Sequence, residues 1–171
     1  ATKDAAAVAR LRSAGAGLIG HANMTEFAYS GLGLNPHYGT PLTPLKEGCI
    51  AGGSTSGGAS AVARGVADIA LGTDTGGSAR IPAAFCGLFG FKATAQTISR
   101  AGAVPLSHSL DSVGVLTREV GLLRPVLNGL RDQPLAASAA PRAVIVPENF
   151  GMDELDPEVA QAFEAALEAL K

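Results

Sequence analysis

Residues 72–80, Gly72-Thr73-Asp74-Thr75-Gly76-Gly77-Ser78-Ala79-Arg80, are the most informative stretch of this sequence, and a related cluster, Gly52-Gly53-Ser54-Thr55-Ser56-Gly57-Gly58, precedes them. A glycine pair before a serine lets the backbone turn tightly and aim successive N–H groups into one space. Such a turn can hold an oxyanion beside the serine hydroxyl. A flexible linker does not fit, because the clusters flank the apolar run Val66–Leu71, and a P-loop is excluded because Gly-Lys-Ser/Thr does not occur. On chemistry alone, a catalytic turn and a non-catalytic one both remain open.

Outward from the two clusters, predicted strands alternate with predicted helices. The predicted helices are Asp4–Ala14, one turn at Met24–Ala28, Gly57–Arg64, a short helix or turn at Pro82–Cys86, Arg118–Leu130, and a last helix capped by Asp156 and begun by Pro157. The predicted strands are Leu18-Ile19, Val66–Leu71, Leu88–Phe91 and Ala143–Val146, and Tyr29–Gly53 is predicted to be a long ordered loop. This alternation predicts an α/β fold with a mixed, largely parallel sheet covered by helices.

The composition excludes several classes of function. The chain has 171 residues, of which 47% are hydrophobic and 16% charged, and this length is typical of one domain. The net charge of −2 gives no attraction for nucleic acid or an anionic membrane. The sequence contains no run of 18 apolar residues, which is about the length needed to span a bilayer. The two cysteines show no metal-ligand spacing, so we interpret them as reduced thiols of a cytoplasmic protein.

Further stretches continue the pattern of the two clusters: Ile81–Gly87 directly after them, Asn23–Ala28 and Asn35–Pro41 upstream, and Gly90–Lys92 and Leu110–Gly114 downstream. Together with the clusters, they closely resemble the amidase-signature family of amide hydrolases. The resemblance covers roughly residues 4–130 in the family's order, which is far more than a short-motif coincidence. It implies the amidase-signature fold and a serine hydrolase that acts on a small-molecule carboxylic amide.

The resemblance also implies a site. The family uses a Ser–cis-Ser–Lys triad, in which Ser78 matches the nucleophile and Ser54, 24 positions earlier (78 − 54), matches the bridging serine. It implies a cis peptide at Gly53–Ser54 and an oxyanion hole formed by the N–H groups of Thr75, Gly76, Gly77 and Ser78. Asp74 and Arg80 are expected to pair and support the turn. We expect the two serine hydroxyls to lie about 2.6–3.5 Å apart. The family needs no metal or organic cofactor.

The third member of the triad is not found. The family's lysine lies about 70 to 80 residues before the bridging serine, which is beyond Ala1. Lys3 is too close to Ser54, at 51 positions (54 − 3). We therefore expect residues 1–171 to be one partial amidase-signature domain, with N- and C-terminal parts missing, and the isolated chain to be inactive.

Alternative functions remain. A glutaminase-type subunit of a tRNA-dependent amidotransferase often carries Gln after the signature Arg, whereas this chain has Ile81, which favours a free-standing amidase, either monomeric or homo-oligomeric. A non-catalytic truncated remnant is the other alternative.

Two weaker signals are set aside. Gly15–Gly20 fits G-x-G-x-x-G, but a predicted helix precedes it where a dinucleotide site needs a strand. His21, His37 and His108 suggest a Ser-His-Asp triad, but neither serine sits in G-x-S-x-G.

Overall fold

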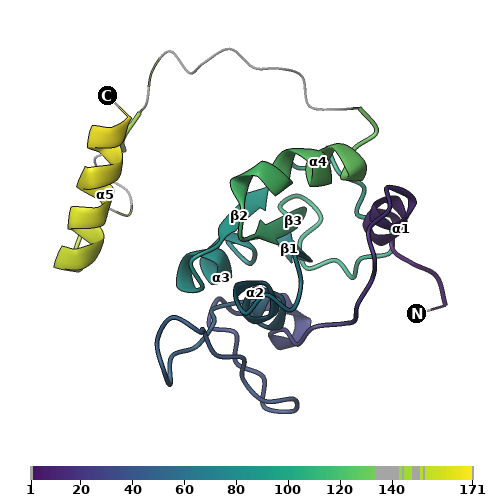
Figure 1. Ribbon diagram of the computed structural model, residues 1–171, viewed down its shortest axis with the longest axis horizontal. Helices are drawn as coiled ribbons and strands as arrows, with labels where there is room; N and C mark the ends of the chain where they lie inside the picture. The colour runs from purple at the N-terminus through teal and green to yellow at the C-terminus, as the bar shows by residue number, and fades with distance from the viewer. Residues whose placement is uncertain (1, 134–142, 144, 148–150, 152, 171) are drawn as a thin grey trace. The chain divides into compact units, whose positions relative to one another are not determined.

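A computed structural model describes residues 2–133, 143, 145–147, 151 and 153–170 (Figure 1). The chain divides into two compact units, Ala1–Ala136 and Ala137–Lys171. The described residues of the second unit form one helix, α5 (Pro157–Ala169), which begins at the predicted proline directly after Asp156. The candidate site lies entirely in the first unit.

The first unit contains a small sheet with helices on both faces. Its helices are α1 (Ala6–Ser13), the single turn η1 (Glu26–Ala28), α2 (Ser56–Ala63), α3 (Arg80–Phe85) and α4 (Val120–Leu130). Its strands are β1 (Ile69–Asp74), β2 (Phe89–Lys92) and β3 (Ser112–Thr117), in the spatial order β1-β3-β2. This arrangement confirms the predicted α/β fold.

The sheet of the described residues is antiparallel, so the expectation of a largely parallel sheet was wrong. β3 pairs antiparallel with β1, Leu71 opposite Val115, and antiparallel with β2, Phe91 opposite Val115. β1 and β2 therefore run in the same direction, as a strand–helix–strand unit should, but β3 lies between them. The sequence analysis did not predict β3, because Ser112 and Gly114 interrupt its apolar pattern.

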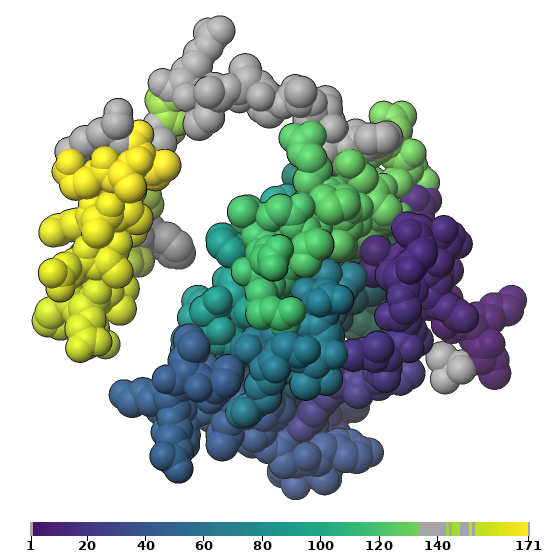
Figure 2. Space-filling view, viewed as in Figure 1, coloured from purple at the N-terminus to yellow at the C-terminus, as the bar shows by residue number. Residues whose placement is uncertain are grey.

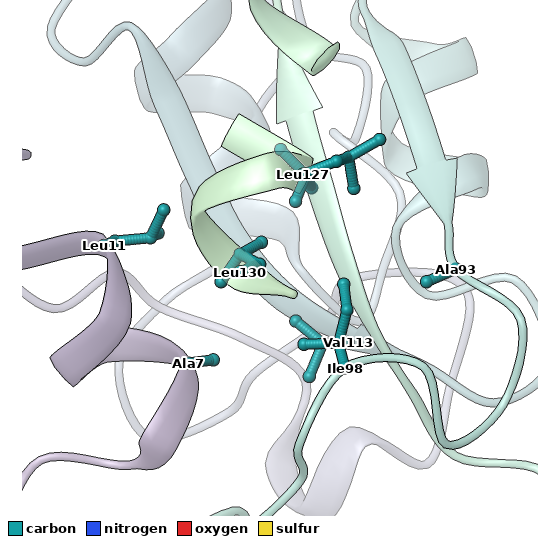
Figure 3. Close-up of a cluster of buried hydrophobic side chains, with 8 residues drawn as sticks. Ala7, Leu11, Ala93, Ile98, Val113, Leu127 and Leu130 are labelled. Carbon is teal, nitrogen blue, oxygen red and sulfur yellow. The ribbon is translucent and has the colours of Figure 1, made fainter. Parts of the chain in front are cut away.

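Alternate residues of β3 contribute to two hydrophobic clusters. Val113 and Val115 belong to the cluster that α1 and α4 cover, to which α1 contributes Leu11 and α4 contributes Leu127 and Leu130 (Figure 3). The surfaces of α1, in purple, and α4, in green, lie against each other in the space-filling view (Figure 2). Leu116 belongs to the second cluster, whose other members are Ala51, Ala59, Ala79, Ala83 and Cys86.

The second cluster is built from small side chains, so α2 and α3 lie very close to the sheet. A Cβ added at Gly114 would lie 2.5 Å from the Cβ of Ala79, and one added at Gly90 would lie 2.6 Å from the Cβ of Ala83. A Cβ at Gly72 would meet the Oγ1 of Thr55 at 2.4 Å. Contacts this short do not occur between real side chains, so these glycines set the height of both helices above the sheet.

Three predicted elements differ from the structure. Leu18 and Ile19 are exposed and form no strand, and Val66 is exposed and precedes β1. Ala143, Ile145 and Val146 are not in a strand, and Val144 lies outside the described residues. Among the described residues, none of the helices combines the length and the apolar character that crossing a membrane requires.

Candidate active site

The two serines singled out in the sequence lie on adjoining segments of the fold. Ser78 is in the turn between the end of β1 at Asp74 and the start of α3 at Arg80, and Ser54 lies just before α2. The N–H of Thr55 donates a hydrogen bond of 3.2 Å to the carbonyl oxygen of Ser78. The backbone thus joins two segments whose serines are 24 positions apart in the sequence (78 − 54).

The peptide bond between Gly53 and Ser54 is cis, which confirms that expectation. Main-chain hydrogen bonds fix both residues of this peptide bond to residues 25–31. The N–H of Gly53 donates to the carbonyl oxygen of Gly31 at 2.7 Å, and the carbonyl oxygen of Ser54 accepts from the N–H of Thr25 at 3.1 Å. Residues 25–31 therefore form one wall of the site.

The hydroxyl of Ser54 has no hydrogen-bond partner among the described residues, although the residue is fully buried. The expected hydrogen bond between the hydroxyls of Ser54 and Ser78 is therefore not formed. Ser78 lines a cavity, whereas Ser54 is fully buried and is not among the residues that line it. The hydroxyls of Ser56 and Ser112 are likewise buried and, among the described residues, unpartnered, and the sequence analysis gave neither a role.

A buried carboxylate holds the turn that carries Ser78. The expected ion pair of Asp74 and Arg80 is present and bidentate, with Nη2 to Oδ1 at 2.8 Å and Nε to Oδ2 at 3.0 Å. The same carboxylate accepts the N–H groups of Gly77 at 2.9 Å and Ala79 at 3.2 Å. Burial raises the pKa of Asp74, but the hydrogen bonds from Arg80 and Ala79 outweigh burial and hold it below its ordinary value of 3.8. The ionised carboxylate therefore fixes the turn from inside.

The turn presents its main chain toward the cavity. Thr75, Gly76 and Ser78 line the cavity, and a Cβ at Gly76 would meet no atom within 4 Å. The N–H of Gly77, by contrast, is already bonded to Asp74. Of the four N–H groups expected to form an oxyanion hole, that of Gly77 is therefore the least available in this structure.

Asp111 is a second buried carboxylate beside the turn, and the sequence analysis assigned it no role. Its Oδ1 accepts from the hydroxyl of Thr75 at 2.6 Å and from the N–H of Ser107 at 3.0 Å, and its Oδ2 accepts from the N–H of Leu106 at 2.8 Å. Burial raises the pKa of Asp111, but the hydrogen bond from Thr75 and those from the two N–H groups outweigh burial and lower it. The available signal was its place in Leu110–Gly114, directly before the missed strand β3.

The cavity beside Ser78 has a volume of about 280 Å³ and is lined by Ala28, Tyr29, Ser30, Gly31, Thr75, Gly76, Ser78, Ile81 and Leu106. A larger cavity of about 470 Å³ lies around His21, Asn23 and His37 and contains neither serine. Since chemistry at Ser78 needs space next to its hydroxyl, we assign the smaller cavity to the site.

Among the described residues, the hydroxyl of Ser54 is bonded to no lysine, and no metal site is found. Lys3 and Lys46 are exposed, and the Nζ of Lys92 donates to the carbonyl oxygen of Ala93 at 2.9 Å. Lys171 lies outside the described residues. Within the described ranges, three or more His, Cys, Asp or Glu side chains nowhere gather as a metal would need.

Comparisons with known proteins agree with this arrangement. The family model described as Amidase matches residues 1–171. An indoleacetamide hydrolase of Pseudomonas savastanoi is 44% identical over 99% of this chain and 38% of its own length. A crystal structure of an amidase superposes with a TM-score of 0.91 and 42% identity, covering 98% of this chain and 39% of that one.

An allophanate hydrolase from Kluyveromyces lactis superposes with a TM-score of 0.75 and 37% identity, over 77% of this chain and 21% of that one. The chain thus spans well under half the length of the relatives that it matches. The family model covers every residue, and the solved amidase shares the fold at 42% identity. The chain therefore belongs to the amidase-signature family.

Proposed function

We propose that the protein containing this chain hydrolyses a small-molecule carboxylic amide through an acyl-enzyme on Ser78. One observation carries the proposal: Ser78 lines an open cavity on a turn that the buried Asp74–Arg80 pair holds from inside, and its own carbonyl oxygen is bonded to the residue after the cis serine. A fixed nucleophile with main-chain N–H groups beside it is suited to acyl transfer.

In the first half of the reaction, the Oγ of Ser78 attacks the amide carbonyl carbon and loses its proton toward Ser54. The carbonyl oxygen becomes an oxyanion, which the N–H groups of Thr75, Gly76 and Ser78 stabilise, since that of Gly77 is bonded to Asp74. The C–N bond then breaks, the leaving nitrogen takes up a proton, and ammonia or an amine departs. A water molecule next attacks the ester carbonyl, and the carboxylic acid and the free hydroxyl of Ser78 are formed.

The base that drives this sequence is proposed to be a lysine from outside residues 1–171. Buried side-chain hydroxyls are nearly always hydrogen-bonded, yet that of Ser54 has no partner among the described residues. A lysine amine next to Ser54 would satisfy it and complete the Ser–cis-Ser–Lys triad that the sequence resembles. Since a serine without a base is a poor nucleophile near neutral pH, we propose that the isolated chain is inactive.

The relatives narrow the proposed reaction. The indoleacetamide hydrolase and the solved amidase favour a free-standing amidase, and Ile81 in the cavity wall puts an aliphatic side chain where the glutaminase-type subunits often have Gln. We accordingly place the glutaminase-type subunit second. The proposed domain is a single amidase-signature domain that includes residues 1–171 and further chain, because the relatives are more than twice as long.

We propose that the protein is located in the cytoplasm, since Cys49 and Cys86 are both free thiols.

Self-association is also proposed. Phe89 and Phe91 lie two positions apart on β2 and are both exposed, so they present apolar surface on one side of the strand.

The test uses the complete protein and a panel of primary amides, with ammonia release as the measurement. Ser78→Ala should abolish release, and Ser13→Ala, at an exposed position of α1, should not change it. A fluorophosphonate probe should add one label to the wild type, detected by intact mass, and none to Ser78→Ala. Ammonia release that survives in Ser78→Ala would refute the assignment of the nucleophile.

A further inference from the structure

The turn that carries Ser78 is held by Asp74 over its second half only. The carboxylate of Asp74 accepts three main-chain hydrogen bonds, of 2.9–3.3 Å, and all three come from residues 77–80. Residues 75–76 lie between Asp74 and those donors and line the cavity beside Ser78. A Cβ built on Gly76 would meet no atom within 4 Å, so side-chain packing does not fix this part of the turn. The position of residues 75–76 therefore depends on a different contact.

Asp111 supplies that contact through the side chain of Thr75. Its Oδ1 accepts a hydrogen bond of 2.6 Å from the hydroxyl of Thr75. The last pair of residues in the ladder of β1 and β3 is Asp74 opposite Ser112, so Thr75 and Asp111 each lie one position beyond it. The hydrogen bond thus extends the connection between the two strands by one residue and includes the first residue of the turn.

Asp111 is itself fixed by contacts with its side chain and its main chain. Its carboxylate accepts from the N–H groups of Leu106 at 2.8 Å and Ser107 at 3.0 Å. Its own N–H donates to the carbonyl oxygen of Ser107 at 3.1 Å, and its carbonyl oxygen accepts from Nη1 of Arg100 at 3.3 Å. Because Asp111 is buried and cannot move without breaking these bonds, it offers Thr75 an acceptor in a fixed place.

We propose that Asp111 is a positioning residue for the acyl-transfer reaction, which fixes the main-chain N–H groups of residues 75–76 through the hydroxyl of Thr75. Donors that are already in place stabilise an oxyanion without reorganising, and a small misplacement of such groups is costly. Asp111 acts through Thr75 and makes no contact with the substrate in this role. The inference rests on the proposed function, because it concerns the oxyanion of the same reaction.

Substitutions of Thr75 in the complete protein test the inference with the amide that the wild type hydrolyses fastest. Thr75→Val keeps the shape of the side chain without the hydroxyl, and its kcat should fall about 10- to 100-fold with KM within about twofold of the wild type. Thr75→Ser keeps the hydroxyl and should retain kcat within about threefold. A normal kcat in Thr75→Val, or an equal loss in Thr75→Ser, would overturn the inference.

A matched variant separates positioning from general stability. Ile98→Val shortens a buried side chain in the hydrophobic cluster that α1 and α4 cover, so it destabilises the fold away from the turn. Its kcat should stay at the wild-type value when all variants are assayed well below their melting temperatures. A loss of kcat in Ile98→Val as large as that in Thr75→Val would assign the effect to stability and contradict the inference.

An inhibitor that forms the oxyanion separates the transition state from the bound substrate. The Oγ of Ser78 adds to the ketone carbon of trifluoroacetophenone, and the ketone oxygen becomes an anion held as in the reaction. The inhibition constant should rise in Thr75→Val by about the factor by which kcat falls. Binding of the intact amide to Ser78→Ala, measured by calorimetry, should be the same after Thr75→Val is added. An inhibition constant that does not change in Thr75→Val would overturn the inference.

Crystal structures of the complete wild type and of Thr75→Val test the hold on the turn without any turnover. The main chain of residues 75–76 should be displaced or have raised B-factors in the variant, whereas residues 77–80 stay in place on Asp74. If the wild type hydrolyses no amide, the proposed function fails, and this comparison still decides whether Asp111 positions the turn. An unchanged main chain at residues 75–76 would refute the positioning role.

Discussion

The hydroxyl of Thr75 donates a 2.6 Å hydrogen bond to the carboxylate of Asp111, a residue 36 positions later in the chain. Thr75 is the first residue after β1, and Asp111 directly precedes β3. The bond therefore connects the end of β1 to the start of β3, beside the turn that carries Ser78. Asp111 is 6% exposed, which makes the contact a buried, charge-assisted one.

Thr75→Val should therefore destabilise the protein. Valine has the shape of threonine but no hydroxyl, and hydrogen bonds to charged groups contribute about 1.5–3 kcal/mol. Urea denaturation should show a loss of that order. Thr97→Val is the control, because Thr97 makes only a local bond to the carbonyl oxygen of Thr94 on the surface, and its loss should be below about 0.5 kcal/mol. Equal losses in both variants would mean that the contact with Asp111 has no special weight.

The lowered pKa of Asp74 predicts a pH-dependent stability. A carboxyl whose folded-state pKa lies below its ordinary value of 3.8 stabilises the fold above that value, and the stabilisation is lost as pH falls through the folded-state pKa. Asp74→Asn should thus cost free energy of unfolding near pH 7, about 2 kcal/mol or more, because the carboxylate receives main-chain and guanidinium donors. The difference between wild type and variant should narrow below pH 3.8. Urea titrations of both proteins at about pH 7 and about pH 3 measure it, and a difference independent of pH would contradict the predicted role of ionised Asp74.

The burial of the Ser54 hydroxyl predicts opposite effects on stability and on activity. A buried hydroxyl without a partner costs free energy, so Ser54→Ala should leave the stability of the 171-residue chain unchanged or slightly raised. In the complete protein, the same change should lower kcat strongly, because it interrupts proton transfer from Ser78.

The double variant Ser54→Ala/Ser78→Ala should be little worse than Ser78→Ala alone, since residues that act as a unit are not additive. Steady-state kinetics of the two single variants and the double variant measure this. Near-normal kcat in Ser54→Ala would show that Ser54 is not on the proton path.

The close contact at Gly114 predicts a severe effect from a single methyl group. Gly114→Ala would place a Cβ 2.5 Å from that of Ala79, next to the nucleophile, and overpacking of this kind costs about 1–3 kcal/mol. Adding Ala79→Gly should restore part of the loss. Gly121→Ala in α4, where no atom lies within 4 Å, should instead stabilise by about 0.4–1 kcal/mol. Thermal melts would decide, and a tolerated Gly114→Ala would show that α3 can move away from the sheet.

The sequence was a good guide where local signals and the resemblance coincide. The turn of Ser78, the short helix after it and the Asp74–Arg80 pair involve residues within a few positions of each other, and the cis peptide before Ser54 was expected from the resemblance alone. The order of strands in the sheet is a long-range property, and nothing near β1 or β2 indicates that β3 lies between them. Leu18 and Ile19 show the converse error: two apolar neighbours were interpreted as a buried strand, but the described fold leaves both exposed.

The role of Asp111 could not be predicted for the same reason. Its partners Thr75 and Leu106 are identified only once the loop before β3 is seen to return to the end of β1. The hydrogen bond expected between the two serine hydroxyls is not formed, and its absence could not be read from the sequence, because it depends on how the two side chains are placed in the fold.

The hold of Asp111 on the main chain of Leu106 has a consequence for how this family could diversify. The carboxylate fixes the position of the backbone and takes no account of the side chain that the backbone carries. Substitutions at position 106 therefore change the surface of the cavity beside Ser78, while Thr75 keeps its hydrogen bond to Asp111. A mutation of Asp111 itself, by contrast, removes the support of Leu106 and of Thr75 at the same time.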